Sequence, residues 1–388
     1  MRILFVVSVP SLQGSNISLL NLITALRKDG HECGLLASRN GYLIDKLEAI
    51  GVKCGIIRYR ASLYPTTATL RDKLLYIPLL CLLSENIINY GKVKQFIKKF
   101  APDIIHTNVS TIDIGYKAAK ELNIPHIWHI REYMDLDFNV HPFPTMISRK
   151  KELSDSYTIS ITKDIRSHFN LEENPKAHVI YNGILKATDL YYQNSKEKYF
   201  LYAAFLQPCK GIYDLLKAYA SHVHQRPETP YRLKLMGGYT PDVYNNIINF
   251  IKEKGIDERV DIMGKVEPRV VNEHLKCASV TFIPSLSEGF GRTMAEAMFN
   301  GCLVAGRNTG GTKEQFDNGL SLAGREIGIR FNTVEEMTAI MNHIYEEGIS
   351  KYEDMTLSSQ KVVSQLYTIE SNHTQILNLY KTVLDERS

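Results

Sequence analysis

Two acidic residues in one short segment offer the clearest chemistry in this chain. Residues 280–301 read VTFIPSLSEGFGRTMAEAMFNG, with seven residues between Glu288 and Glu296. The pattern predicts a strand, a glycine-rich turn that carries Glu288, and a helix that contains Glu296 and ends at Gly301. An ionised carboxylate accepts hydrogen bonds through two oxygens, so each glutamate can receive two neighbouring hydroxyls of a sugar.

The start of the predicted helix adds a site for phosphate. The amides of Arg292, Thr293 and Met294 lie in the first turn, where the helix dipole favours an anion. Gly289 and Gly291 let the backbone approach a ligand closely because they have no Cβ. A diphosphate on the helix end, with a transferred sugar on one glutamate and a ribose on the other, describes a nucleotide sugar.

The same residues also allow a purely structural interpretation. Glu296 follows Arg292 by four residues, a spacing that permits an ion pair on the helix surface. Glu288 can simply complement the positive end of the helix dipole. The residues alone therefore leave the structural and the ligand-binding interpretations open.

The elements that must position these residues alternate between strands and helices. Strand-like runs in the first half are RILFVVSV, HECGLLA, VKCGIIRY, DIIHTNV, HIWHIRE, SYTISIT and AHVIYNG; those in the second are KYFLYAAF, YRLKLMGG, VDIMGKV, SVTFIPS and CLVAGRN. Several are apolar throughout, as strands buried on both faces are. We predict an α/β protein with two doubly wound parallel sheets joined near residues 187–198. Ligands should bind at the carboxyl ends of the strands, in the cleft between the domains.

Composition excludes several classes of protein. The 388 residues suit two domains, and no apolar run is long enough to span a bilayer. Six scattered cysteines without a Cys-x-x-Cys motif argue for a reducing cytoplasm and against a zinc site. Residues 1–185 carry 23 Lys and Arg against 17 Asp and Glu, which suggests an anionic surface or partner. The dense basic runs of a nucleic-acid binder are missing, so we expect no nucleic-acid partner.

The first strand and its loop exclude another class. The start, MRILFVVSVP, is predicted to be a buried strand rather than a signal peptide, because no small-x-small cleavage site follows it. The loop PSLQGSN then has Gly14 alone, where a dinucleotide-binding site would need Gly-x-Gly-x-x-Gly. A nicotinamide or flavin cofactor is therefore not expected.

The Glu-x7-Glu segment resembles the signature of the retaining nucleotide-sugar glycosyltransferases of family 4, which have the GT-B fold of two Rossmann-like domains. Further blocks resemble that family in the same order along nearly the whole chain: PDIIHTN (102–108), IPHIWHIRE (124–132), AHVIYNGI (177–184), PCKGIYDLLKAY (208–219) and GRNTGGTKE (306–314). Within the family, the resemblance is to the transferases of cell-envelope and capsular polysaccharides.

The resemblance implies a role for each matching residue. Glu296 is similar to the glutamate that binds the ribose hydroxyls, and Glu288 to the one that contacts the donor sugar. Lys210 resembles the lysine that holds the diphosphate, where its charge would stabilise the leaving group. His129 resembles a histidine near the donor sugar. Glu288, Lys210 and His129 are thus the expected catalytic residues, and the expected donor-binding residues are Gly14, Ser15, Lys210, Glu288, Gly289, Phe290, Gly291, Arg292, Thr293 and Glu296.

Some of these residues keep an alternative. Lys210 can be a solvated loop lysine, and His129 a hydrogen-bonded histidine at the edge of the cleft. Gly14 and Ser15 match the glycine-rich loop of the first domain only in part, because the usual Gly-Gly pair is Gly-Ser here.

One departure from the family concerns the diphosphate. The family commonly has an arginine shortly before the lysine, in a Gly-Arg-Leu triplet, but this chain has Ala204-Phe205-Leu206. A guanidinium on the diphosphate is thereby lost. Arg292 is the first candidate substitute, and Arg131 is the second.

Two further patterns suggest a metal without supporting one. Asp135-Leu136-Asp137 spells the Asp-x-Asp with which other glycosyltransferases hold a divalent cation, but it lies in the first domain and the donor signature lies in the second. His126 and His129 are three residues apart on a predicted strand, so they point to opposite faces. We expect no metal, and no cofactor beyond the nucleotide diphosphate sugar that serves as co-substrate.

The region most suggestive of a membrane is LLYIPLLCLL (74–83) followed by GKVKQFIKKF (91–100). The apolar run is too short to span a bilayer. The lysines of the second run, beside Phe96 and Phe100, can lie on an anionic membrane, which would suit a lipid-linked acceptor. The alternative is a buried helix with a solvated basic end.

We therefore predict a retaining, metal-independent glycosyltransferase of the cytoplasm, peripheral at the inner face of the membrane. It would have an acceptor domain (1–185), a donor domain (186–360) and a C-terminal helix within 361–388 that crosses back to the first domain. The sugar would pass to a glycan acceptor, expected to be lipid-linked, in cell-surface polysaccharide synthesis. One rival is a non-catalytic subunit that supports a partner transferase; the other is a nucleotide-sugar hydrolase or epimerase. Base, sugar and acceptor have no signature in the sequence.

Overall fold

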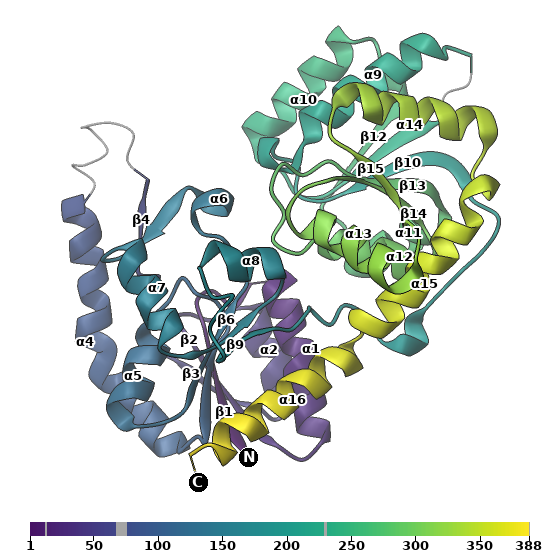
Figure 1. Cartoon of the computed structure of the whole chain (residues 1–388). Coiled ribbons are helices and arrows are strands. Elements are labelled where there is room, and N and C mark those ends of the chain that lie inside the picture. The colour runs from purple at the N-terminus through teal and green to yellow at the C-terminus, as the bar shows by residue number, and fades with distance from the viewer. Residues whose placement is uncertain (12–13, 67–75, 229–230, 388) are drawn as a thin grey trace. The chain divides into compact units, whose positions relative to one another are not determined.

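The chain folds into two compact units. The computed structural model describes residues 1–11, 14–66, 76–228 and 231–387 (Figure 1). Unit 1 comprises Met1–Gly183 together with Ile369–Ser388, and unit 2 comprises Ile184–Thr368. The segment 187–198 lies inside unit 2, where the amide of Tyr191 donates to the carbonyl of Phe299 at 2.9 Å.

Unit 1 is built on a parallel sheet of seven strands in the order β3-β2-β1-β5-β6-β8-β9. The strands are β1 (Arg2–Val7), β2 (Glu32–Ala37), β3 (Lys53–Ile56), β5 (Ile104–Thr107), β6 (His126–Ile130), β8 (Tyr157–Ser160) and β9 (Ala177–Val179). Its helices are α1 (Gly14–Lys28), α2 (Tyr42–Glu48), α4 (Tyr76–Phe100), α5 (Ile114–Leu122), α6 (Asp135–Phe138), α7 (Met146–Ser154), α8 (Lys163–His168) and α16 (Ile369–Asp385). All seven strands coincide with the runs predicted from the first half of the sequence.

Strand β1 shows why these runs are apolar throughout. Ile3 and Phe5 face the core formed with α1, α2 and α16, whereas Leu4 and Val6 face the core formed with α4 and α5. Figure 1 shows these two groups of helices on opposite faces of the sheet. Because successive side chains point to opposite faces and both faces are covered, the residues from Ile3 to Val7 are all buried and apolar.

Unit 2 repeats the plan with six parallel strands in the order β12-β11-β10-β13-β14-β15. The strands are β10 (Glu197–Ala203), β11 (Arg232–Met236), β12 (Val260–Gly264), β13 (Ala278–Ile283), β14 (Leu303–Arg307) and β15 (Ile329–Phe331). Its helices are α9 (Ile212–Gln225), α10 (Pro241–Glu253), α11 (Pro268–Cys277), α12 (Arg292–Phe299), α13 (Gly310–Ala323), α14 (Val334–Glu347) and α15 (Glu353–Leu366). The two doubly wound parallel sheets of the predicted α/β class are thus confirmed.

The sequence did not predict the short or interrupted elements. Strand β15 has only three residues, and so do β4 (Leu63–Pro65) and β7 (Val140–Pro142), which pair antiparallel beside the main sheet. The helix expected over 361–385 is two helices in the structure, α15 in unit 2 and α16 in unit 1. Three residues give too short a window for periodicity to be recognised.

The basic end of α4 corrects one expectation. Phe100 is only 1% exposed, and an ideal Cβ on Gly34 would lie 2.7 Å from its ring. The ring of Phe96 packs in the same way on Gly55. These two rings therefore pack toward the core and not toward a membrane, because the missing Cβ atoms of two strand glycines make room for them.

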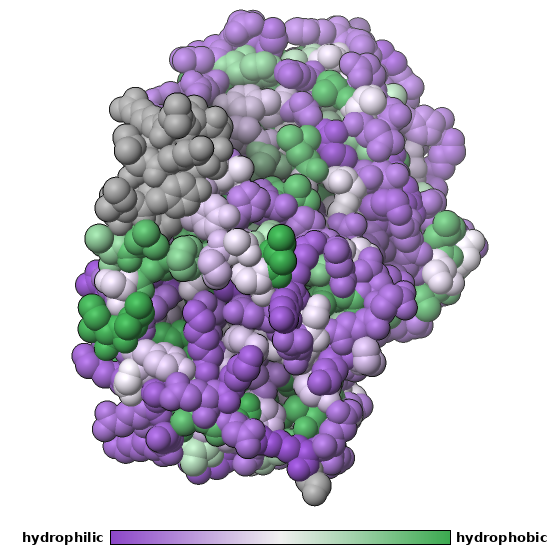
Figure 2. Space-filling model, turned by 60° about the vertical axis from the view of Figure 1, so that its left-hand side comes forward, coloured by the Kyte–Doolittle hydropathy of each residue, from purple (hydrophilic) through white to green (hydrophobic). Residues whose placement is uncertain are grey.

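The other end of α4 does expose apolar side chains. Ile87 is 80% exposed, Ile88 71% and Leu80 51%, and Figure 2 shows hydrophobic residues gathered at this outer side of unit 1. Of the predicted run 74–83, residues 74 and 75 lie outside the described part of the chain. Within the described part, no helix has the length and apolar character needed to cross a membrane.

Candidate functional site

Glycines shape the loop that carries Glu288. The loop joins β13 to α12 and ends at Gly291, whose φ of 85° is the left-handed conformation that glycine adopts readily. The first turn of α13 packs against it, and the amide of Gly311 donates to the main-chain oxygen of Glu288 at 2.6 Å. A Cβ on Gly311 would lie 2.6 Å from the Cα of Phe290. The starts of two helices can therefore meet at Glu288 only because Gly311 has no side chain.

The carboxylate of Glu288 forms an ion pair with Lys210, whose Nζ lies 2.9 Å from Oε2. Lys210 ends the 3₁₀ turn Pro208–Lys210 that follows β10. The amide of Leu286 donates to the carbonyl of Cys209 at 2.9 Å and so ties this turn to the Glu288 loop. Because β10 and β13 are neighbours in the sheet, two residues far apart in the sequence meet at the carboxyl ends of their strands.

Arg292 and Glu296 form a second ion pair one turn along α12, with 3.1 Å between Nη2 and Oε1. The structural interpretation that the sequence left open thus holds for this pair. It does not exclude a ligand, since the bond uses one carboxylate oxygen and leaves the other. The two side chains keep 18% and 24% of their exposure, so the pair adds little to stability and can exchange partners.

The start of α12 offers fewer amides than predicted. The amide of Met294 donates to the carbonyl of Gly291 at 3.0 Å, so the expectation that it serves as a phosphate donor is wrong. The hydroxyl of Thr293 donates to the carbonyl of Ala203 at 2.9 Å and fastens α12 to the end of β10. The main-chain amides of Arg292 and Thr293 remain as the candidate donors for phosphate.

Phe290 contributes to this loop through its backbone. Its side chain is 3% exposed and packs edge-on against Tyr367, with 5.3 Å between the ring centroids. Its carbonyl accepts a hydrogen bond of 2.5 Å from Nε2 of Gln315 in α13. Sequence reasoning did not identify Gln315, which is 1% exposed and holds the loop through this hydrogen bond.

Phe205 stands where the family commonly has an arginine. Its ring is 46% exposed, and a Cβ on Gly238 would lie 2.9 Å from it, so the ring lies over the backbone that follows β11. Of the two candidate substitutes, Arg292 lies in unit 2 at the start of α12, whereas Arg131 lies in unit 1. Arg292 is therefore the substitute that the geometry of unit 2 favours.

A second polar cluster surrounds His129 at the carboxyl end of β6 in unit 1. Nδ1 of His129 lies 3.1 Å from Nε2 of His106 in β5 and 3.3 Å from Nη2 of Arg131. The guanidinium of Arg131 also donates to the side-chain oxygens of Asn108 at 2.9 Å and Asn182 at 2.6 Å. Both asparagines stand in sequence blocks that resemble the family, but sequence reasoning did not assign them a role.

The donors in this cluster determine the tautomer of His129. A guanidinium can only donate, so Nδ1 of His129 must accept. Nε2 of His106 must then donate to the same atom, which leaves Nδ1 of His106 to accept from the hydroxyl of Tyr380 in α16, 2.7 Å away. His129 consequently carries its proton on Nε2. That atom is buried and has no hydrogen-bond partner in the described part of the chain.

Burial keeps the two histidines and Tyr380 of this cluster uncharged. Desolvation, with the charge of Arg131 as a second cause, holds the pKa values of His106 and His129 well below the ordinary value. Desolvation likewise raises the pKa of Tyr380, so its hydroxyl keeps its proton. At neutral pH, His129 is an uncharged hydrogen-bond donor rather than a general acid.

Gly14 and Ser15 begin α1 at the same edge of unit 1. Nδ2 of Asn108 donates to the main-chain oxygen of Ser15 at 3.5 Å. Nδ2 of Asn16 donates to the carbonyls of Val9 and Ser11, both at 2.8 Å, and so holds the preceding loop. Through Asn108, the Gly-Ser loop shares a partner with Arg131, although residues 12 and 13 lie outside the described part of the chain.

The Asp-x-Asp segment is committed to local structure. Asp135 lies 2.8 Å from Nε2 of His168, and Asp137 accepts from the amide of Tyr133 at 2.7 Å. His126 bonds to Thr107 at 2.7 Å, apart from the partners of His129. Among the described residues, no group of three or more His, Cys, Asp and Glu side chains is arranged to hold a metal ion.

Two family models match this chain, one over each half. Residues 12–185 match the family model described as Glycosyltransferase Family 4, and residues 191–361 match the model described as Glycosyl transferases group 1. The chain belongs to the GT-B glycosyltransferases. The first match includes His129 and its partners, and the second includes Lys210, Glu288 and Glu296.

Curated glycosyltransferases are similar over part of their length. An uncharacterized glycosyltransferase of Methanocaldococcus jannaschii is 24% identical over 59% of this chain and 62% of its own. The trehalose synthase of Thermococcus litoralis is 28% identical over 50% of this chain and 43% of its own length. The D-inositol 3-phosphate glycosyltransferase of Corynebacterium glutamicum is 30% identical over 27% of this chain and 26% of its own length. The chain therefore spans from about a quarter to three fifths of the length of these relatives.

Solved structures extend the likeness of the fold to the whole chain. Anabaena HepE, whose structures contain UDP or UDP-glucose, aligns with a TM-score of 0.78 for the UDP complex at 18% identity, over 98% of this chain and 100% of its own. The lipopolysaccharide outer core galactosyltransferase WaaB aligns with a TM-score of 0.67 at 16% identity over all of both chains. At such identities the likeness concerns the GT-B fold.

Proposed function

We propose that this GT-B chain transfers a sugar from a nucleoside diphosphate sugar to a hydroxyl of a glycan acceptor, with retention of configuration and without a metal ion. The observation that carries the proposal is that two ion pairs lie at one edge of unit 2. Lys210 with Glu288, and Arg292 with Glu296, put two cations and two carboxylates around the start of α12. A diphosphate flanked by two sugars needs this combination of groups.

In the proposed reaction, the bond between the anomeric carbon and the phosphate oxygen breaks, and the acceptor oxygen bonds to the same face of the sugar. The acceptor proton passes to the departing phosphate oxygen. Lys210 and the amides at the start of α12 stabilise the negative charge that develops on the diphosphate. The resemblance to the retaining transferases supports this front-face course.

Glu288 and Glu296 hold the two sugars of the donor. In the unliganded chain each carboxylate is oriented by a cation, Lys210 for Glu288 and Arg292 for Glu296. When the donor binds, the cations turn to the diphosphate, and the carboxylate oxygens accept from the hydroxyls of the transferred sugar and of the ribose. His129 supplies an N–H donor for the transferred sugar from unit 1, and the backbone of Gly14 and Ser15 completes the donor contacts.

The choice of donor and acceptor rests on the relatives. The UDP and UDP-glucose complexes of HepE support a nucleoside diphosphate hexose as donor. The name of WaaB supports an acceptor in cell-surface polysaccharide synthesis, and a lipid-linked glycan at the inner face of the membrane is the form we propose. The trehalose synthase and the inositol phosphate transferase act on other acceptors by name, so the acceptor needs a direct test.

The exposed end of α4 supports contact with an anionic membrane. Leu80, Ile87 and Ile88 recur at the spacing of one helix face, and Lys92 and Lys99 continue that face toward the basic end. Flotation with liposomes that contain anionic lipid should recover the wild-type chain but not the double variant Ile87→Ser with Ile88→Ser. Ile147→Ser is the matched control, since Ile147 is 82% exposed on α7. Equal flotation of all three would contradict membrane contact through α4.

The replacement of the family's arginine by Phe205 favours a second candidate, a non-catalytic subunit that supports a partner transferase. The exposed ring over Gly238 brings no positive charge to the diphosphate. Such a subunit would bind no nucleotide and would be unstable without its partner. A hydrolase or epimerase would instead turn over the donor without any acceptor.

A thermal-shift screen against UDP, GDP, ADP, TDP and CMP, with and without EDTA, tests the proposal. A specific ligand raises the melting temperature because it binds the native state alone. We expect a shift with one nucleoside diphosphate that persists in EDTA and is lost in Glu296→Ala. Turnover of the matching sugar nucleotide should then require an acceptor, and the product's anomeric configuration, measured by NMR, should equal that of the donor. No shift with any nucleotide would favour the subunit.

A further inference from the structure

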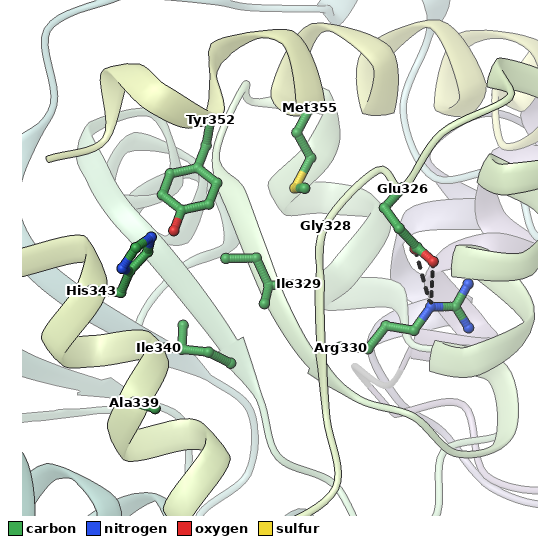
Figure 3. A pocket seen from close by; sticks show the side chains of 9 residues that line it. All are labelled: Glu326, Gly328, Ile329, Arg330, Ala339, Ile340, His343, Tyr352 and Met355. Atoms are coloured by element: carbon green, nitrogen blue, oxygen red, sulfur yellow. Dashed lines mark hydrogen bonds and ion pairs between the residues drawn. The ribbon is translucent and has the colours of Figure 1, made fainter. Parts of the chain in front are cut away.

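A cavity of about 590 Å³ lies beside β15 in unit 2 (Figure 3). Strand β15 is the last strand of the sheet that the described residues form, so the cavity follows the edge of the sheet. Residues of β15, α14 and the start of α15 line it, and none of them belongs to the Glu288 loop, α12 or the Lys210 turn. Its volume falls within the range of small-molecule sites, roughly 300 to 1,000 Å³.

The middle of the cavity is apolar. Figure 3 shows Ile329 of β15, Ile340 of α14 and Met355 of α15 between two polar ends. At one end the hydroxyl of Tyr352 points toward the imidazole of His343, and the two rings lie edge to face with 6.3 Å between their centroids. A methionine in the wall lets the cavity adjust to ligands of different shape.

The acidic and basic side chains of the cavity already have partners. Nε of Arg330 lies 3.0 and 3.1 Å from the two carboxylate oxygens of Glu326, and its Nη1 lies 2.7 Å from Asp317. Nε2 of His343 lies 3.2 Å from Glu347. An ionic ligand would have to break one of these pairs, whereas an uncharged ligand can use the hydroxyl of Tyr352 as its polar contact.

Arg330 connects the cavity to helix α13. Its guanidinium lies over the ring of Phe316 at 5.0 Å and bonds to Asp317, and both residues belong to α13. The first turn of the same helix donates from Gly311 to the carbonyl of Glu288, and Gln315 clamps the carbonyl of Phe290. A ligand that moves Arg330 therefore acts on the helix that positions the Glu288 loop.

We propose that this cavity is a regulatory site for an uncharged, mainly apolar small molecule with one hydrogen-bonding group, and that its occupancy changes the affinity of the Glu288 loop for nucleotide. The regulatory part rests on the proposed function. The binding part does not, because it concerns residues outside the nucleotide site.

The binding part is tested with N-phenyl-1-naphthylamine, an uncharged fluorescent probe, and with anilinonaphthalene sulfonate, its anionic analogue. Ala339 is exposed at the cavity wall, so Ala339→Phe fills the cavity from the surface without disturbing the core. Glu335→Phe adds the same ring to α14 outside the lining and serves as the matched control. We expect saturable binding of the uncharged probe that weakens roughly tenfold or more in Ala339→Phe alone.

Three results would overturn the binding part. The first is equal binding of the uncharged probe to the wild type, Ala339→Phe and Glu335→Phe, which would mean that the probe binds elsewhere, such as on the exposed face of α4. The second is tighter binding of the anionic analogue. The third is a loss of self-association in Ala339→Phe, measured by sedimentation, which would mean that a second copy of the chain covers the cavity.

The regulatory part is tested by titrating the nucleoside diphosphate with and without saturating uncharged probe. We expect its dissociation constant to change by about fivefold or more in the wild type. The effect should become smaller in Asp317→Asn, which weakens one of the two links from Arg330 to α13 but does not line the cavity. An unchanged dissociation constant would overturn regulation alone. Absence of nucleotide binding would overturn regulation together with the proposed function, and the probe titration would still decide whether the cavity binds.

Discussion

The two polar clusters lie at equivalent places in their own sheets but hold their side chains in opposite ways. In unit 2, Lys210 with Glu288 and Arg292 with Glu296 are ion pairs whose side chains keep 18% to 25% of their exposure. In unit 1, His129 is fully buried in a chain of hydrogen bonds from Tyr380 through His106. Partly exposed ion pairs in unit 2 contrast with buried, uncharged histidines beside Arg131 in unit 1.

The difference matches two different tasks. Partly exposed ion pairs are weak, so their members can turn to a charged ligand at low cost. A buried chain of hydrogen bonds is costly to disturb and keeps one donor in a fixed direction. Unit 2 is thus suited to exchange a charged diphosphate, and unit 1 to present a neutral N–H group that does not change its charge near pH 7.

The largest expected effect follows from removing the cation of unit 2. Lys210→Ala should lower kcat by about 10² to 10³-fold, because one group that stabilises the leaving diphosphate is lost. Its melting temperature should stay close to that of the wild type, since Lys210 is partly exposed. Lys217→Ala is the control. Lys217 is exposed on α9, and its Nζ forms only a weak ion pair with Asp214, 4.0 Å away. A loss of kcat below threefold in Lys210→Ala would remove Lys210 from the mechanism.

The next effect concerns the pH dependence of stability in unit 1. Folded His106 and His129 stay neutral because burial lowers their pKa values, whereas the unfolded chain takes up protons near pH 6.5. The free energy of unfolding should therefore fall as the pH drops below 6.5. Each histidine contributes a slope of at most about 1.4 kcal/mol per pH unit.

His129→Gln measures this contribution through urea unfolding at several pH values between 5 and 7. The slope should become shallower than in the wild type. Glu132 acts in the opposite sense, because burial raises its pKa to about 7 and the folded state then holds a proton that the unfolded state releases. An unchanged slope in His129→Gln would mean that His129 is not neutral in the folded chain.

A smaller effect tests the chain of hydrogen bonds itself. Tyr380→Phe removes the donor to Nδ1 of His106 and should let His106 adopt either tautomer, whereas Arg131 still donates to Nδ1 of His129. We expect kcat to fall about threefold to tenfold, in line with the loss of one hydrogen bond. The ¹⁵N shifts of His106 should change from the pure Nε2–H pattern to that of a mixture. Tyr219→Phe, which removes a buried hydroxyl from unit 2, should lower stability without altering those shifts.

The smallest effect on stability is expected for the exposed pair of unit 2. Arg292→Gln should lower the free energy of unfolding by only about 0.3 to 0.5 kcal/mol, the usual contribution of such a helix pair. The affinity for the nucleoside diphosphate should nevertheless fall if, as we propose, Arg292 substitutes for the arginine missing at Phe205. A large loss of stability with unchanged affinity, measured by unfolding and by calorimetry, would show that the pair is structural.

Much of the fold was predictable because strands buried on both faces leave continuous apolar runs. Twelve predicted strands correspond to β1–β3, β5, β6, β8 and β9 in unit 1 and to β10–β14 in unit 2. The periodicity could not identify β15, which is too short, and it could not assign Phe96 and Phe100. Their burial depends on the absence of Cβ atoms at Gly55 and Gly34, which come close only when the sheet and α4 pack together.

The candidate site likewise has a part that could be predicted from the sequence and a part that could not. The segment around Glu288 and Glu296 shows its chemistry locally, because a glycine-rich turn before a helix is read from adjacent residues. The amide of Met294 was assigned wrongly to phosphate, since it donates to the carbonyl of Gly291, whose left-handed conformation is set by the turn in the folded chain. The burial of the Phe290 ring against Tyr367 also depends on the fold, and it leaves the backbone of Phe290 as the part that can face a ligand.

The sequence by itself determined the sheet class, the helix start at Arg292 and the residue types available for binding a nucleotide sugar. Only the tertiary structure decided which of these residues meet. Strand order brings Lys210 to Glu288, and α16 brings Tyr380 to His106 across most of the chain. The physical reason is that local sequence encodes backbone conformation and the apolar face of each element, whereas contacts between distant side chains depend on how those faces pack.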